Sequence, residues 1–203
     1  MSGCRRAGLT SRFETANELR IADLGLLMAQ RRKAMRSDLS SRQMIYIEAP
    51  SEYDENRRSV FLAGGISDCD DWQTRLAAML TDTDLVVLNP RRRSFPGDEI
   101  GIEEAQIRWE FRHMRRAGLR AFWFPPQTLC PITLYELGAW SMTDRPLLVG
   151  VDPAYARRAD VEIQTCLARP EVQIESSLDD LAARIKTWCA AGVTNETHQE
   201  IGR

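Results

Sequence analysis

Between residues 59 and 190, short apolar runs alternate with segments of helical periodicity, and this alternation constrains the fold more than any other feature. Strands are expected at residues 59–66, 84–90, 121–124, 146–151 and 172–174. Helices are expected at residues 71–80, 102–117, 133–142, 156–168 and 178–190. Five strands that alternate with helices predict an α/β protein, a three-layer sandwich in which a five-stranded parallel sheet is covered on both faces.

The bulk composition excludes several classes of protein. A chain of 203 residues with 43% apolar residues is most simply a single domain with an ordinary core. A net charge of −2 gives no reason to expect nucleic acid or an anionic membrane as a partner. No run approaches the roughly 18 apolar residues of a membrane span, and residues 1–6 lack the apolar stretch of a signal peptide, so we expect a cytoplasmic protein.

The sequence shows no motif for a metal or a cofactor. The five cysteines form no CxxC pair and no Cys/His cluster, so reduced thiols are expected and a zinc site is not. Neither a GxGxxG fingerprint nor a Walker motif is present, which argues against NAD and ATP. We therefore expect no cofactor.

Charge divides the chain into unequal parts. Residues 1–43 carry nine Lys and Arg against four Asp and Glu, and residues 14–36 have near-helical apolar spacing. We expect a basic, helical N-terminal extension over residues 1–43, a main domain over 44–193, and a polar tail over 194–203.

Glu136 lies close to the predicted carboxyl edge of the sheet, where open α/β sheets bind ligands. Two interpretations of this residue remain open. Thr133 and Glu136 have the spacing of a capping box, in which Glu136 serves only to begin a helix. Alternatively, the helix amino end lowers the pKa of Glu136 and keeps it ionised, as an attacking carboxylate requires.

Glu110, on the preceding predicted helix, also has two interpretations. An isolated helical glutamate is usually exposed, and Arg108 and Arg112 are placed to neutralise it. If it meets Glu136 at one site, the pair has the composition that glycosidic chemistry uses, a nucleophile and an acid/base. Its apolar neighbours Trp109 and Phe111 would then raise its pKa.

Four ordered motifs give the chain a family resemblance. They are residues 60–66 with 71–73, residues 89–92, residues 106–110, and residues 122–138. Together they resemble the nucleoside 2-deoxyribosyltransferase family, and more closely its nucleoside 2-deoxyribosyltransferase-like branch. The resemblance implies a flavodoxin-like (Rossmann-like) sheet and an enzyme that breaks the N-glycosidic bond of a nucleoside or nucleotide.

The same resemblance assigns roles to site residues. It makes Glu136 the nucleophile, which forms a glycosyl-enzyme ester and then passes the sugar to another base or to water. It makes Glu110 the residue that assists the base. The implied substrate-binding residues are Phe61, Gly64, Gly65, Asp71, Trp72, Asn89, Arg91 and Cys130. Phe61 replaces a family tyrosine and Cys130 replaces an acidic residue, so sugar, base and acceptor stay open.

Partners follow from the resemblance as well. A small nucleoside or nucleotide is expected as the ligand, and a homo-oligomer as the assembly, with Arg158 and Asp160 as candidates to complete a neighbour's site. Two alternatives remain. In one, the fold is a non-catalytic nucleotide-binding module in which Glu136 is a cap; in the other, residues 1–43 are an interaction arm on an inert domain.

Overall fold

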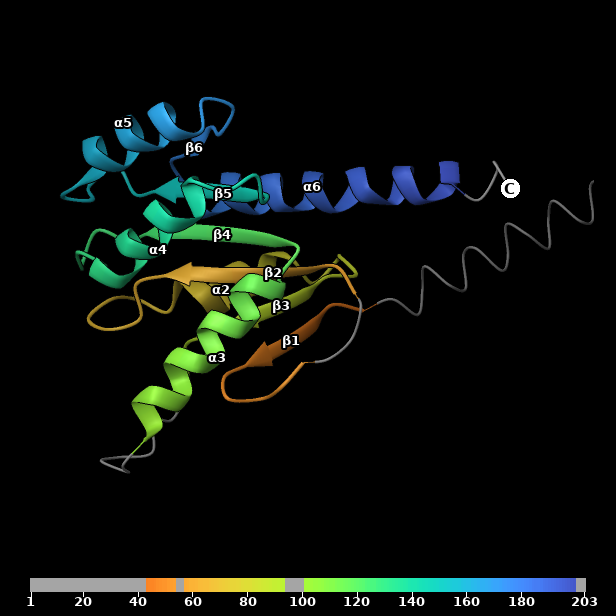
Figure 1. The fold of residues 1–203 in the computed structure, drawn as a ribbon, viewed down its shortest axis with the longest axis horizontal. Coiled ribbons are helices and arrows are strands. Elements are labelled where there is room, and N and C mark those ends of the chain that lie inside the picture. The colour runs from red at the N-terminus through yellow and green to blue at the C-terminus, as the bar shows by residue number, and fades with distance from the viewer. Residues whose placement is uncertain (1–42, 54–56, 94–100, 200–203) are drawn as a thin grey trace, which may run out of the picture. The chain divides into compact units, whose positions relative to one another are not determined.

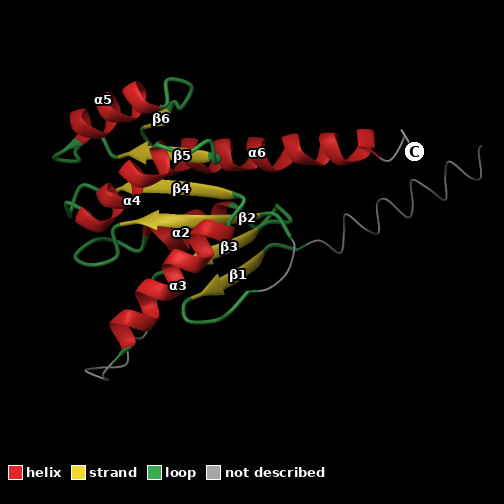
Figure 2. Ribbon diagram, in the orientation of Figure 1, coloured by secondary structure: helices red, strands yellow, loops and turns green. Residues whose placement is uncertain are grey.

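A computed structural model of the chain describes residues 43–53, 57–93 and 101–199. The expected helix over residues 14–36 lies outside the described residues. In the described part, six parallel strands form one sheet in the order β1-β3-β2-β4-β5-β6 (Figures 1 and 2). The predicted α/β architecture with a parallel sheet is confirmed.

The elements alternate along the chain as the sequence predicts. The strands are β1 (Ile45–Glu48), β2 (Ser59–Gly64), β3 (Val86–Asn89), β4 (Leu119–Phe124), β5 (Leu147–Val151) and β6 (Ile174–Glu175). The helices are α2 (Trp72–Met79), α3 (Ile102–Arg116), α4 (Pro131–Ser141), α5 (Arg158–Ala168) and α6 (Leu178–Gln199). Helix α6 continues past residue 193, where the main domain was expected to end.

The expected count of five strands is corrected to six by β1, which pairs in parallel with β3. All four residues of β1 are only partly buried, whereas all four residues of β3 are buried. Residues 44–47 do form a short apolar run, but it lies before the region in which strands and helices alternate regularly, so the alternation from residue 59 onward does not count it.

Helices cover both faces of the sheet. On one face, α2 with its C-cap residue Leu80 and α6 contribute Leu76, Leu80, Leu181 and Ile185 to a buried cluster. On the other face, α3, α4 and α5 contribute Trp109, Met114, Leu137 and Val161 to a second cluster. Figure 1 shows α3 and α4 crossing the near side of the strands, with α2 behind them.

The chain reverses its direction of travel across the sheet at β2. From β2 it proceeds to β3 on one side, and after α3 it returns to β4 on the other side of β2. The loops that follow β2 and β4 therefore diverge, which leaves a crevice at the carboxyl ends of these strands.

The spacing of Ala105, Ile107, Phe111 and Met114 predicts that these residues form the buried face of α3, and this prediction is wrong in part. Of the residues expected inside, Met114 is buried, whereas Ile107 and Phe111 are more than 60% exposed. The helix instead buries Gln106 and His113 with Trp109. These polar side chains are tolerated because Gln106 donates to the carbonyl of Pro90 and His113 bonds the carbonyl of Trp109, so hydrophobicity alone misplaces the buried face.

Among the described residues, no helix combines the length and the apolar character needed to cross a membrane.

Candidate active site

Glu110 and Glu136 line one cavity of about 340 Å³ at the carboxyl end of β2. Glu110 comes from α3 and Glu136 from α4, so two successive helices deliver the two carboxylates. The remaining wall consists of Phe61, Ala63, Gly64, Gly65, Ile66, Ser67, Pro90, Thr128, Cys130, Pro131, Ile132 and Thr133. The structure therefore brings together six of the residues singled out from sequence: the two glutamates, Phe61, Gly64, Gly65 and Cys130.

The capping-box interpretation of Glu136 is wrong. Helix α4 begins at Pro131, and its N-cap is Cys130, which has a left-handed φ of 47° and makes no side-chain cap hydrogen bond. Proline favours the first helical position because its φ is already helical and it needs no N–H partner. The helix thus begins earlier than the predicted residue 133, and Glu136 lies in its second turn, where a helix start needs no carboxylate.

The predicted direction of the pKa shift of Glu136 is also wrong. Burial, and then the negative charge of Glu110, raise the pKa of Glu136 to about 8. In the second turn the helix amino end acts weakly, because its field falls off within the first turn. Within the described residues, Glu136 makes no hydrogen bond or ion pair that would favour its charged form.

Glu110 is half-buried and is not neutralised by the arginines on its own helix. Arg108 pairs with Glu104 at 2.6 Å, and Arg112 pairs with Glu52 at 2.5 Å. Burial raises the pKa of Glu110, and a hydrogen bond from Gln106 and the charge of Arg92 oppose that rise.

The glycine turn after β2 is required by packing. A Cβ on Gly64 would lie 2.4 Å from the backbone oxygen of Trp123 and 2.4 Å from the Trp72 ring. A Cβ on Gly65 would lie 2.8 Å from the Thr128 methyl group and 2.9 Å from the Cys130 sulfur. Glycine at both positions lets the turn lie directly against β4 and the loop that follows it, and so shapes the floor of the cavity.

Cys130 contributes a buried thiol to the cavity. Burial raises its pKa to about 11, which keeps it protonated at neutral pH. A thiolate nucleophile at this position is therefore disfavoured.

Three of the expected substrate-binding residues hold the surrounding loops. Asp71 caps α2 by accepting a hydrogen bond from the Thr74 amide at 3.0 Å. The guanidinium of Arg91 donates to the backbone carbonyls of Ile66, Cys69 and Asp70. Asn89 donates to the Tyr46 hydroxyl and accepts from the Arg91 amide. The structure does not place these three side chains on the cavity wall.

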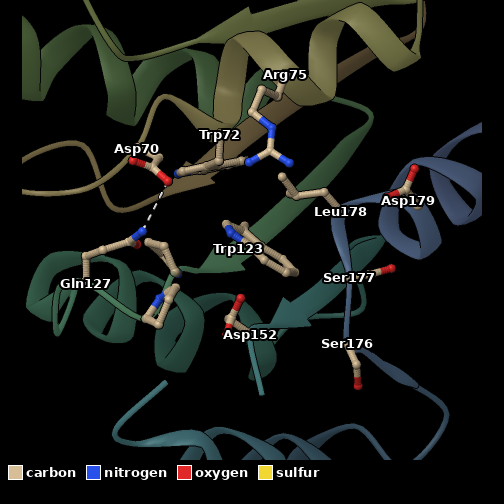
Figure 3. Close-up of a pocket in the computed structure, with 12 residues that line it drawn as sticks. Asp70, Trp72, Arg75, Trp123, Gln127, Asp152, Ser176, Ser177, Leu178 and Asp179 are labelled. Atoms are coloured by element: carbon tan, nitrogen blue, oxygen red, sulfur yellow. Dashed lines mark hydrogen bonds between the residues drawn. The ribbon is translucent and has the colours of Figure 1, made fainter. Parts of the chain in front are cut away.

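Trp72, the fourth of these residues, lies on the opposite side of the sheet. It lines a separate cavity of about 250 Å³ with Trp123, Asp70 and Asp152 (Figure 3). Its indole nitrogen donates to the Gly65 carbonyl at 2.9 Å, which ties α2 to the glycine turn.

Sequence reasoning missed two polar residues behind Glu110. Gln106 precedes Glu110 by four positions and donates to its carboxylate at 2.7 Å, and Arg92 donates to Gln106. Both residues lie inside motifs that carry the family resemblance. The helical i, i+4 spacing of Gln106 and Glu110 is a signal for Gln106, whereas no comparable pattern points to Arg92.

The two residues proposed for a neighbouring copy's site have partners within the chain. Arg158 pairs with Glu162 and donates to the Val151 carbonyl. Asp160 pairs with Arg157 at 3.0 Å.

Fold and cavity define a doubly wound, flavodoxin-like α/β protein with two carboxylates at the reversal point of its sheet. Residues 57–155 match the model of the family described as nucleoside 2-deoxyribosyltransferase like. The matched range contains every catalytic and substrate-binding residue expected from sequence, including Glu110 and Glu136, but not Arg158 or Asp160. A comparison with curated protein sequences gives no match.

Proposed function

We propose that this protein is an enzyme that breaks the N-glycosidic bond of a nucleoside or nucleotide, with Glu136 as the nucleophile and Glu110 as the acid/base. The observation that carries the proposal is the convergence of these two carboxylates on one cavity from successive helices. The match of residues 57–155 to the nucleoside 2-deoxyribosyltransferase-like family supports the same reaction class.

The reaction needs both groups. The Glu136 carboxylate attacks C1′ of the sugar and forms an ester as the bond from C1′ to the base nitrogen breaks. Glu110 gives its proton to the departing base, which leaves neutral. In the second step a water molecule or a second base loses a proton to Glu110 and attacks C1′, which returns Glu136 to the carboxylate.

The cavity is suited to such a substrate. Its volume of about 340 Å³ lies within the common range of small-molecule sites. Phe61, Pro131 and Ile132 offer apolar surface for a base, and the Thr133 hydroxyl and the two carboxylates offer polar contacts for a sugar.

The test is a panel of ribonucleosides, 2′-deoxynucleosides and their 5′-monophosphates, incubated with and without a free acceptor base. Mass spectrometry of the products separates hydrolysis from base exchange and reports the sugar preference. We expect base release from at least one substrate, abolished in Glu136→Gln and Glu136→Ala proteins that keep the wild-type circular dichroism spectrum. No turnover across the panel, or turnover retained in both variants, contradicts the proposal.

A second candidate function is a non-catalytic nucleotide-binding module. It is favoured by the raised pKa of Glu136, about 8, because a protonated carboxyl is a poor nucleophile. Phe61 and Cys130, which lack the polar groups of the transferases, favour it too. This module would be stabilised thermally by a nucleotide without turnover, and Glu136→Gln would leave the binding nearly unchanged.

We propose further that the protein assembles as a homo-oligomer through α4. Ile132 and Tyr135 on this helix are 67% and 78% exposed, and Met142 at its C-cap is 81% exposed. Glu136 is the single charged residue of α4, and a helix that is apolar all round is normally covered. Because Ile132 also lines the cavity, a second copy on α4 would lie beside the site. Light scattering of the wild type and of a Tyr135→Glu variant tests this: a monomeric wild type contradicts it.

A further inference from the structure

A chain of hydrogen bonds reaches Glu110 from behind. The Arg92 guanidinium donates through Nε to Oε1 of Gln106 at 2.5 Å. The amide nitrogen of Gln106 then donates to Oε1 of Glu110 at 2.7 Å and to the Pro90 carbonyl at 2.8 Å. Because an arginine can only donate, the oxygen of the Gln106 amide must face Arg92 and its NH₂ group must face Glu110.

This arrangement favours the charged form of Glu110. Gln106 is 9% exposed, so its amide has little freedom to turn away, and it offers Glu110 a donor and no acceptor. An ionised carboxylate accepts such a bond more strongly than a neutral carboxyl does. The positive charge of Arg92 acts in the same direction.

Glu136 has the opposite surroundings. Within the described residues no donor reaches its carboxylate, and the titratable groups around it are Glu110 from α3 and the Cys130 thiol from the loop after β4. The end of β2 adds only Phe61, Ala63 and the glycine turn, none of which carries charge. A buried carboxyl beside a carboxylate stays protonated, because two negative charges there are costly.

We propose that the ligand-free protein holds a single proton on this pair, placed on Glu136 and not on Glu110, and that Gln106 is the positioning residue that keeps it there. This inference rests on the proposed function, since it assigns the protonation states of the two proposed catalytic groups before substrate binds. Arg92 contributes by fixing the orientation of the Gln106 amide.

The consequence is a proton relay. Before Glu136 attacks C1′, its proton passes to Glu110, and as the C1′–base bond breaks Glu110 delivers the same proton to the base. At that point Glu136 is esterified and Glu110 is again a carboxylate. When water or an acceptor base releases the sugar, its proton goes to Glu110, and the free pair once more holds one proton. The pair therefore supplies the proton that the leaving base needs without drawing on solvent.

The test is a pH titration by ¹³C NMR of full-length protein labelled at the glutamate side-chain carboxyl carbon, without substrate. The signals of Glu110 and Glu136 are assigned by their disappearance in Glu110→Gln and Glu136→Gln proteins. In the wild type we expect the Glu110 signal to be that of a carboxylate at pH 7 and the Glu136 signal to titrate near pH 8. Ionisation of Glu136 before Glu110 overturns the inference.

The variant Gln106→Met has nearly the same volume and removes the donor. We expect the first ionisation of the pair to move up by about one pH unit, the scale of one hydrogen bond to a charged group. The variant Arg92→Gln keeps a donor toward Gln106 but removes the charge, so it should raise the first ionisation of the pair by a smaller amount. This variant provides the test if Gln106→Met does not fold. An unmoved first ionisation in a folded variant overturns the inference.

Gln73→Met is the matched control. Gln73 is also buried, donates to a backbone carbonyl (that of Gly65) and accepts from an arginine, Arg91, but in the part of the chain that the structure describes no carboxylate receives its hydrogen bond. It should leave both glutamate titrations in place. Because no substrate is used, an inactive protein with the expected titration order refutes the proposed function alone, and an active protein with the reverse order refutes this inference alone.

Discussion

The negative charge of Glu110 raises the pKa of Glu136, although 26 positions of sequence separate the two residues. The coupling exists because α3 and α4 deliver the two carboxylates to the same cavity at the carboxyl end of β2. The coupling means that a change at either glutamate is felt at the other, so the two must be titrated as a pair.

Replacing Glu110 by glutamine should lower the pKa of Glu136 and slow base departure. The pKa falls because the neighbouring negative charge is gone, while burial still keeps it above the ordinary value. Loss of the acid should reduce kcat by about 10²- to 10⁴-fold. A nucleoside whose base leaves without protonation should lose much less, and comparison of such a substrate with an ordinary one is the measurement. Equal losses for both substrates would show that Glu110 does not protonate the base.

Glu136 should make the protein less stable as the pH rises. Its pKa is about 8 in the folded protein and near its ordinary value of 4.5 when unfolded, so the folded state binds more protons between these values. Stability therefore falls as the pH rises through this window. Relative to Glu136→Gln, the wild type should lose about 2 kcal/mol of unfolding free energy between pH 5 and pH 9, allowing for partial screening by solvent.

Urea unfolding of both proteins at several pH values measures this difference. Asp82→Asn is a suitable control, because Asp82 lies on the surface and its pKa is lowered by Lys186. If the difference in unfolding free energy between wild type and Glu136→Gln does not change with pH, Glu136 is not a buried group that is uncharged in the folded protein.

Sequence reasoning succeeded where the physics is local. Continuous apolar runs such as β3 and β4 are buried on both faces, and their pattern predicts them well. It failed where tertiary contacts decide. The Thr133 to Glu136 spacing fits a capping box, yet the helix begins about one turn earlier, after Cys130 in a left-handed backbone conformation. The i, i+4 spacing of Gln106 and Glu110 makes a hydrogen bond between them possible, but it does not show that Gln106 is buried and held in place by Arg92.

Alanine at Gly64 should destabilise the protein by about 3 kcal/mol, the upper part of the range for overpacking. The added carbon would lie 2.4 Å from a backbone oxygen of β4, which cannot move without shifting the strand. Thermal unfolding measures the loss. Gly138→Ala on α4 is the matched control, because a Cβ there meets nothing within 4 Å, and it should stabilise the helix by up to about 1 kcal/mol. Equal behaviour of the two variants would show that the turn has room for a side chain.

Arg91→Met decides whether this arginine holds the loop or binds the base. Its guanidinium donates to three backbone carbonyls of the β2–α2 connection and pairs with Asp71 at 3.5 Å, so we expect a loss of about 2–3 kcal/mol of unfolding free energy. Arg93→Met, whose side chain is 80% exposed, should cost less than about 0.5 kcal/mol. Combined thermal unfolding and steady-state kinetics separate the two roles: a residue that binds the base would raise KM without changing stability, whereas a residue that holds the loop would lower the melting temperature as well.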